Sequence, residues 1–353
     1  MKDRARRFAF ALLVCTTVAS ARVERLTVHA RALEGNIAGE PAEQEVLVYL
    51  PPSYDTASQR RYPVIVLLHG IADPPDRWVK THHVPDLLDR LAAANRLPEF
   101  IAVMPNGQTK FFGSFYVNSA VNGRWEDYIA VDLIGYVDAH YRTLARPESR
   151  GVAGHSMGGF GAIVMAMHRP DVFRAAYAIS PCCLDAVEDI GYANESWRRA
   201  MAFKNTADVE KARDTGDFYP VAIVALGRAL APDAQAPLLF DFPIRAEGPQ
   251  LMPDEPAYTK WREAFPIRQV PRYAENLRSM KGLTIEYGLS DQFPHIPLST
   301  AAFSQALIDA RVPHTLDVYS GDHRRAVNER LESKVFPFFA ATLAVSEPPA
   351  KSP

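Results

Sequence analysis

A serine flanked by glycines is the first feature of the chain that could carry chemistry. It lies in the run GHSMGG at residues 154–159, after the apolar stretch 151–153 and before a helical pattern at 160–167. A serine on a sharp strand-to-helix turn needs glycines two positions away on either side, because the backbone leaves no room for side chains there. The run lacks the glycine spacing of nucleotide-binding loops. We therefore expect Ser156 to be a nucleophile rather than part of an ordinary turn.

A serine hydroxyl attacks only when a base takes its proton and a carboxylate orients that base. In chains with this turn, the partners follow in the order serine, acid, histidine. Asp291 follows the predicted strand 283–287, and His323 stands on a loop after the predicted strand 314–319. We expect Asp291 to be the acid and His323 to be the base.

Four other residues after the serine compete for these two roles. Glu286 lies inside a strand pattern, where a structural role is expected. His295 lies on the loop of the acid, and His314 opens a strand. Asp322 is adjacent to His323 and is expected to be a solvated loop residue.

The oxyanion of the tetrahedral intermediate needs two N–H donors that are already in place. One is expected from Met157, which follows the nucleophile at the start of its helix. The other is expected from Ile71, on the loop after the predicted strand 63–68. His69 on the same loop is compatible with a core position, since only backbone is needed from this loop.

The composition is that of a globular enzyme, and it excludes several function classes. The chain has 353 residues, of which 48% are hydrophobic and 23% are charged, and its formal net charge is −2. A chain without a Lys/Arg-rich run is not expected to bind nucleic acid. His82 and His83 lack the spacing of a zinc-binding helix and are expected to be surface residues, so no metal is expected.

The first 21 residues have the layout of a secretory signal peptide. Basic residues precede the apolar run 8–18, and the small residues at 19–21 form a cleavage site. A membrane anchor is the alternative, but the apolar run is shorter than the roughly 20 residues that a span needs. A lipid anchor at Cys15 is a weaker one, because the bulky Val14 precedes it. We expect a secreted or periplasmic protein without a stable membrane span.

The two remaining cysteines, Cys182 and Cys183, are adjacent. Neighbouring cysteines can bridge only through a strained ring, although disulfides are common in exported proteins. Two small, half-buried residues at a strand end are the favoured interpretation. A vicinal disulfide is the alternative.

Apolar runs rich in β-formers alternate with helical patterns, which predicts an α/β fold with a mainly parallel central sheet flanked by helices. Strands are predicted at 23–29, 44–50, 63–68, 99–104, 150–155, 174–180, 283–287 and 314–319, and helices at 83–95, 126–142, 297–311 and 326–342.

Residues 184–282 have another texture, rich in proline and aromatic residues and poor in strand patterns. They are predicted to form a cap or lid inserted into one α/β domain at 22–345, followed by a flexible Pro-rich tail at 346–353. The aromatic residues of the insertion either line the acyl pocket or form a small core of the insertion itself. The aromatic residues with these two possible roles are Trp197, Phe240, Phe242 and Trp261.

The chain resembles the esterase D, feruloyl esterase and mycolyltransferase group of α/β-hydrolases. The similar stretches are VYLPPSY at 48–54, YPV through HG at 62–70, SFY through WEDYI at 114–129, the serine turn and the ends DQF at 291–293 and GDH at 321–323. The resemblance covers most of 44–183 and 283–342. It does not extend over 184–282, the region where acyl and alcohol groups would bind.

The resemblance implies an α/β-hydrolase fold, the same serine, aspartate and histidine, and no cofactor. It implies hydrolysis of a carboxylic ester, of feruloyl, acetyl or another small acyl type, through an acyl-enzyme. Acyl transfer to a sugar or lipid alcohol is the alternative, and a non-catalytic binding protein is a remote one. The partner is then a small-molecule, carbohydrate or lipid ester. Tyr116 and Trp125 are expected to bind substrate, and the oligomeric state stays open.

Overall fold

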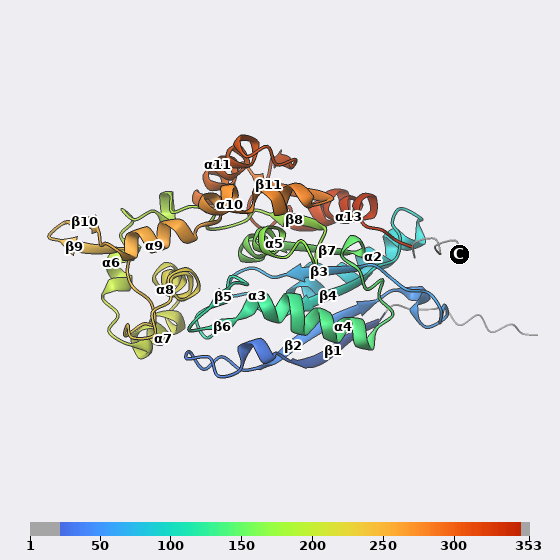
Figure 1. Ribbon diagram of the computed structural model, residues 1–353, viewed down its shortest axis with the longest axis horizontal. Coiled ribbons are helices and arrows are strands. Elements are labelled where there is room, and N and C mark those ends of the chain that lie inside the picture. Colours follow the sequence, from blue (N-terminus) through green and yellow to red (C-terminus); the bar gives the residue numbers. More distant parts are fainter. Residues whose placement is uncertain (1–21, 347–353) are drawn as a thin grey trace, which may run out of the picture.

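The computed structural model describes residues 22–346, so the expected signal peptide and residues 347–353 of the expected tail lie outside the described residues. A central eight-stranded sheet has the order β1-β2-β4-β3-β7-β8-β11-β12 (Figure 1). The pairs β1–β2 and β2–β4 are antiparallel, and every other pair is parallel. The strands are β1 (Arg22–His29), β2 (Glu43–Leu50), β3 (Val64–Leu68), β4 (Ile101–Pro105), β7 (Arg150–His155), β8 (Ala175–Ile179), β11 (Gly282–Gly288) and β12 (Thr315–Tyr319).

Helices cover both faces of this sheet. One apolar core joins it to α3 (Trp125–Asp127), α4 (Ile134–His140), α5 (Met157–His168), α10 (Pro266–Ser279) and α11 (His295–Asp309). The other core joins it to α1 (Arg77–Lys80), α2 (Val84–Ala93), α12 (Val327–Arg330) and α13 (Phe336–Thr342). Short π-helical turns at Tyr128–Leu133 and Leu331–Val335 link α3 to α4 and α12 to α13.

The central strand β3 shows why the sheet is buried on both sides. Val64, Val66 and Leu68 pack into one core, and Ile65 and Leu67 pack into the other. A continuous apolar run is expected for a parallel strand with helices on both faces. The predicted α/β-hydrolase fold is confirmed, and the predicted strand ends agree with the structure to within two residues.

Of residues 184–282, the part up to Ala264 forms mostly short helices at one end of the molecule, away from α13, whereas α10 packs on α5 against the sheet and does not belong to the predicted cap (Figure 1). The part up to Ala264 contains α6 (Ser196–Met201), α7 (Thr206–Asp214), α8 (Phe218–Leu230) and α9 (Ala257–Ala264), together with the hairpin of β9 (Ile244–Glu247) and β10 (Gln250–Pro253). A second small hairpin, of β5 (Asn118–Ser119) and β6 (Gly123–Arg124), lies before α3. Because β5 contacts α8, the insertion is anchored on the part of the domain next to the serine helix.

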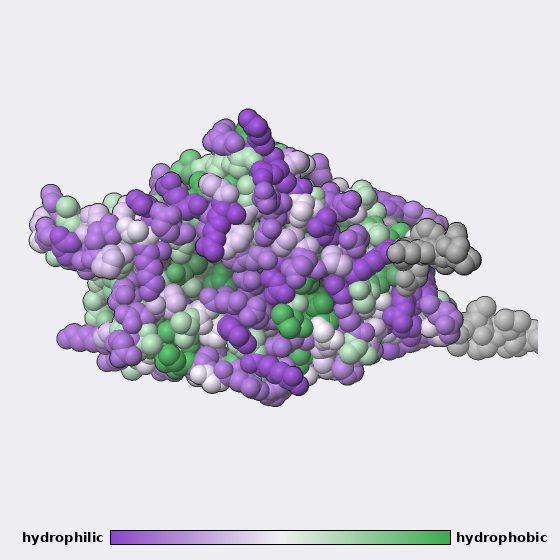
Figure 2. Space-filling model, in the orientation of Figure 1, coloured by the Kyte–Doolittle hydropathy of each residue, from purple (hydrophilic) through white to green (hydrophobic). Residues whose placement is uncertain are grey.

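The face of the molecule seen in Figure 2 is mainly polar. Figure 2 shows one face, on which hydrophilic residues dominate and apolar residues form scattered spots. Within residues 22–346, no helix is both long enough and apolar enough to cross a membrane.

Candidate active site

Ser156 stands on a strained turn between β7 and α5. Its φ is 58° and its ψ is −115°, in a region that non-glycine residues seldom occupy. A side chain at Gly154 would lie 2.2 Å from the backbone of Gly158, and one at Gly158 would lie 1.9 Å from the carbonyl oxygen of Leu68. The two glycines therefore let β7, the turn and α5 come close enough to hold this conformation.

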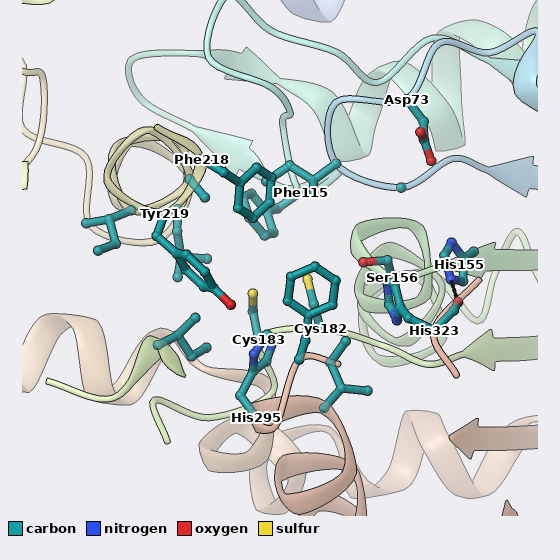
Figure 3. Close-up of a pocket in the computed structure, with 18 of the residues that line it drawn as sticks. Asp73, Phe115, His155, Ser156, Cys182, Cys183, Phe218, Tyr219, His295 and His323 are labelled. Atoms are coloured by element: carbon teal, nitrogen blue, oxygen red, sulfur yellow. Dashed lines mark hydrogen bonds between the residues drawn. The ribbon is translucent and has the colours of Figure 1, made fainter. Parts of the chain in front are cut away.

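His323 and Asp291 are brought together at the same edge of the sheet as Ser156. His323 Nδ1–H donates to Asp291 Oδ2 at 2.8 Å, and both side chains are almost completely buried. The other carboxylate oxygen of Asp291, Oδ1, accepts a hydrogen bond from the backbone N–H of Phe293 at 2.9 Å. Because Nδ1 is occupied, the other ring nitrogen is left for the pocket, which His323 and Ser156 both line (Figure 3).

His155, beside the serine, holds the loop of His323. Its Nε2–H donates to the His323 carbonyl oxygen at 2.6 Å, and the two rings pack with their centroids 4.4 Å apart. Burial lowers the pKa of His155 well below its ordinary value, and the nearby His323 lowers it further. His155 is therefore a neutral donor that positions His323, a role that sequence reasoning missed.

The two backbone amides predicted to bind the oxyanion belong to Met157 and Ile71. Met157 begins α5 directly after the serine, and Ile71 lines the pocket beside Gly70. Among the hydrogen bonds of residues 22–346, neither amide donates to a protein acceptor. His69 holds the loop that carries Ile71. Its Nδ1–H donates to the Gly70 carbonyl and its Nε2 accepts the Gly107 N–H, each at 2.8 Å.

The serine opens into a cavity of about 230 Å³. Much of its wall comes from the insertion: Ile190, Trp197, Phe218, Tyr219, Ala222, Ile223 and Leu226. Of the four aromatic residues singled out from the sequence, Trp197 lines this cavity, whereas Phe240 and Phe242 line a separate hollow. Trp261 is fully buried and packs against Trp197.

Tyr116 and Trp125 do not lie where the substrate-binding role requires. Both are fully buried, and neither lines the cavity. The Tyr116 hydroxyl donates to the His69 carbonyl at 3.1 Å, and the Trp125 indole donates to the Asn122 carbonyl at 2.9 Å. Both side chains are used for packing and internal hydrogen bonds, and Phe115 is the member of this segment that reaches the cavity.

The rivals for acid and base are engaged elsewhere. Glu286 accepts hydrogen bonds from Tyr177 and Arg330 in the core, and the ring of His314 contacts the Ser304 hydroxyl at 2.7 Å. Asp322 accepts two backbone N–H groups of its own turn.

A second histidine–carboxylate pair lies beside the same cavity, which its histidine lines. His295 opens α11, and its Nδ1–H donates to Asp189 at 2.9 Å. Asp189 also accepts from the His295 backbone and from the Tyr219 hydroxyl, each at 2.8 Å. No motif marks Asp189, and 106 residues separate it from His295, so the sequence offered no signal for this pair.

Cys182 and Cys183 are free thiols, both buried and both on the wall of the cavity. They follow β8, as the sequence suggested, but they are more buried than expected there. For metals, the residues that the structure describes hold no group of three or more His, Cys, Asp or Glu side chains that could bind an ion. His82 instead contacts Asn328 through its ring at 2.6 Å.

Comparison with known proteins places the chain among esterases. A family model described as "Putative esterase" matches residues 41–329. An endo-1,4-beta-xylanase/feruloyl esterase of Xylanibacter ruminicola is 31% identical over 133 residues, which are 37% of this chain and 18% of that protein. An esterase of Mycobacterium tuberculosis is 38% identical over 122 residues, which are 34% of this chain and 25% of that protein. The matched segments are thus a quarter or less of these relatives.

Solved structures share the fold over nearly the whole chain. A ferulic acid esterase aligns with a TM-score of 0.64 at 20% identity, covering 92% of this chain and 99% of its own. A fluorophosphonate-binding serine hydrolase of Staphylococcus aureus aligns with a TM-score of 0.61 at 18% identity, covering 91% and 99%. At such identities the likeness concerns the fold.

Proposed function

This chain belongs to the esterase family whose model it matches, and we propose that it is a serine hydrolase that cleaves carboxylic esters through an acyl-enzyme. One observation carries the proposal. A serine on a strained strand-to-helix turn shares a cavity with a histidine that donates to a buried carboxylate. This combination is the arrangement that makes a hydroxyl nucleophilic.

In the proposed reaction, His323 accepts the hydroxyl proton as Ser156 Oγ attacks the ester carbonyl carbon. Asp291 stabilises the imidazolium that forms. The carbonyl oxygen becomes an oxyanion, which the amides of Met157 and Ile71 stabilise. His323 then protonates the departing alcohol, which leaves an acyl-enzyme. In the second half, His323 takes a proton from a water molecule that attacks the acyl carbonyl carbon, and it returns the proton to Ser156 Oγ as the acid leaves.

The cavity favours a small or aromatic acyl group. Its walls are mainly apolar, and its volume of about 230 Å³ matches a small or aromatic acyl group more closely than a long chain. Two of the proteins similar to this one are named for feruloyl or ferulic acid esters. We propose an acetyl, feruloyl or similar acyl group, with residues 184–264 acting as a cap that forms the acyl wall.

We also propose that the protein is exported, since residues 1–21 have the composition of a signal peptide. Sequencing of the mature N-terminus from the secreted or periplasmic fraction should begin at Arg22. A mature chain that retains residues 1–21 would contradict export by cleavage.

A panel of esters tests the proposed activity. The purified protein should hydrolyse p-nitrophenyl acetate and methyl ferulate faster than p-nitrophenyl palmitate, because the cavity matches a small or aromatic acyl group more closely than a long chain. Ser156→Ala should lose about 10⁴-fold or more in kcat on each ester that the wild type cleaves. Equal rates for wild type and Ser156→Ala would overturn the proposal.

A further inference from the structure

Cys182 lies directly beside the serine. Its backbone N–H donates to the Ser156 carbonyl at 3.2 Å, and its side chain lines the same cavity. The ester-cleavage steps proposed above make no use of this thiol. Figure 3 shows Cys182 and Cys183 in the middle of the cavity, between Ser156 and Tyr219.

The histidine next to these cysteines has one ring nitrogen without a hydrogen-bond partner. His295 uses Nδ1 to reach Asp189, and its side chain is only 5% exposed. Among the described residues its buried Nε2 has no hydrogen-bond partner, and the Cys182 thiol lines the same cavity, close enough to interact with the His295 side chain. A buried imidazole held by a carboxylate and close to a thiol is an arrangement that activates cysteine.

We propose that Cys182, His295 and Asp189 form a second nucleophilic site in this cavity, and that Cys182 is the position at which small uncharged electrophiles modify the protein. The classes concerned are α-halo amides and related soft electrophiles. In the reaction the Cys182 thiolate sulfur bonds to the electrophilic carbon, the carbon–halogen bond breaks, and the halide leaves with the electron pair. The proton of the thiol is on His295 before the reaction begins.

The charges around the thiol favour this assignment. Burial raises the pKa of Cys182, but the interactions with the Cys183 and His295 side chains and the charges of His295 and His323 outweigh it, so that the pKa falls to about 6. Burial likewise lowers the pKa of His295, but Asp189 and Cys182 outweigh it and raise the pKa to about 9. The Tyr219 hydroxyl donates to Asp189, and burial together with that carboxylate raises the pKa of Tyr219, so this hydroxyl stays neutral.

Cys183 is the matched internal control. It is the adjacent residue, it is equally buried and it lines the same cavity. Its pKa lies well above the ordinary value, because its interaction with the Cys182 side chain, burial, and the negative charges of Cys182 and Asp189 all favour the protonated thiol. Two neighbouring cysteines should therefore differ sharply in reactivity.

Alkylation with iodoacetamide at pH 6, followed by mass spectrometry of the peptides, tests the proposal. The native protein should gain one carbamidomethyl group, on Cys182. Cys182→Ser should remove the labelling, and Cys183→Ser should retain it. Labelling of Cys183, or no labelling of the folded protein at pH 6, would overturn the proposal.

A variant of the histidine tests its part in activating the thiol. Without the imidazolium the thiol should return to a pKa above 8, so at pH 6 the thiolate fraction falls by about a hundredfold. Intrinsic nucleophilicity rises by about tenfold with that pKa change, so the net rate should fall about tenfold. His295→Asn should show this loss and an upward shift in the midpoint of the pH–rate profile, whereas His314→Asn should not.

A melting curve shows whether His295→Asn folds, and Asp189→Asn keeps the proposal testable if it does not. Asp189→Asn should also shift the midpoint of the pH–rate profile upward. A midpoint unchanged in a folded variant at either position would contradict the assignment. Labelling is read by mass, so it can succeed whether or not the protein is an esterase. Only a loss of ester turnover after labelling would depend on the proposed function.

Discussion

At the scale of single residues, two local features, a strained turn and a side-chain hydrogen bond, bring Ser156 and His323 to the same place. The strained turn projects the serine from the end of β7, and the hydrogen bond from His155 fixes the loop that carries His323. The second feature uses a side chain of the serine turn itself. Nucleophile and base are therefore positioned from one short segment of the chain.

Replacing His155 should weaken catalysis without weakening substrate binding. His155→Phe keeps the ring but loses the donor to the His323 carbonyl, so His323 is less well placed. We expect kcat to fall by about 10- to 100-fold with KM changed little. Steady-state kinetics on p-nitrophenyl acetate measure this.

His155→Gln supplies the control, because its amide can donate to the same carbonyl. It should recover a large part of kcat. If Phe and Gln variants are equally impaired, or if KM alone rises, the positioning role is wrong.

The serine, acid and base could be selected from the sequence because each follows a recognisable element. Ser156 lies within a glycine-spaced turn, and Asp291 and His323 each follow a predicted strand. Tyr116 misled the assignment because chain position does not determine which way a side chain points. Its ring fills the space above Gly107 and Gly161, where a Cβ would lie 2.3 Å and 2.6 Å from it.

At the scale of elements, α8 is the part of the insertion that most affects the cavity. Five residues from its first three turns line the wall, and its first residue, Phe218, stacks on Phe112 with ring centroids 5.7 Å apart. The helices α6 and α9 pack against α8, and their Trp197 and Trp261 form a cluster with Phe240.

Truncating the wall should change substrate preference. Phe218→Ala removes an aromatic face that a feruloyl ring would contact, so the kcat/KM of methyl ferulate should fall by about tenfold relative to that of p-nitrophenyl acetate. Thermal stability should change little, since Phe218 is only partly buried. The ratio of the two kcat/KM values is the measurement.

Phe240→Ala is the matched control in the same insertion. Phe240 is buried and packs on Gly227, away from the cavity, so its loss should cost about 3–5 kcal/mol of stability and leave the ratio unchanged. An unchanged ratio in Phe218→Ala would show that the insertion does not set acyl preference.

The strands and helices of the sheet could be predicted well because burial on two faces imposes a clear apolar pattern. The insertion could not, because its helices are short and its core is built from aromatic residues far apart in sequence. Trp197 meets Trp261 only in the folded chain.

At the scale of the whole molecule, a buried ionic network ties the last helices to the sheet. Arg330 of α12 donates to Glu286 of β11 at 2.6 Å and to Asp317 of β12 at 2.5 Å, and Tyr177 of β8 donates to Glu286 at 2.5 Å. The network crosses three neighbouring strands beside the ends that carry Asp291 and His323. Its integrity therefore bears on the site as well as on stability.

Removing the cation should destabilise the protein strongly. Arg330→Met leaves the buried Glu286 without its partner, which costs about 3–5 kcal/mol for a buried pair. Urea denaturation measures the loss. Adding Glu286→Gln should restore a large part of it by removing the unpaired charge, and a double variant no more stable than the single one would contradict this account.

The strand order around this network could not be taken from the sequence. Sequential patterns indicate which segments are strands, whereas the return of β3 between β4 and β7 is set by crossover packing of helices on both faces. Glu286 illustrates the difference, since its place inside a strand predicted a structural role but gave no sign of Arg330.

Labelling with a fluorophosphonate probe, mapped by mass spectrometry, tests the central claim most directly. The probe reacts with a hydroxyl only when a base activates it. We predict one phosphonyl group per chain on Ser156 in the wild type and in Cys182→Ser, none in Ser156→Ala, and loss of ester turnover in proportion to labelling. A wild-type protein that stays unlabelled, a label on another residue, or turnover that survives in Ser156→Ala would contradict the account.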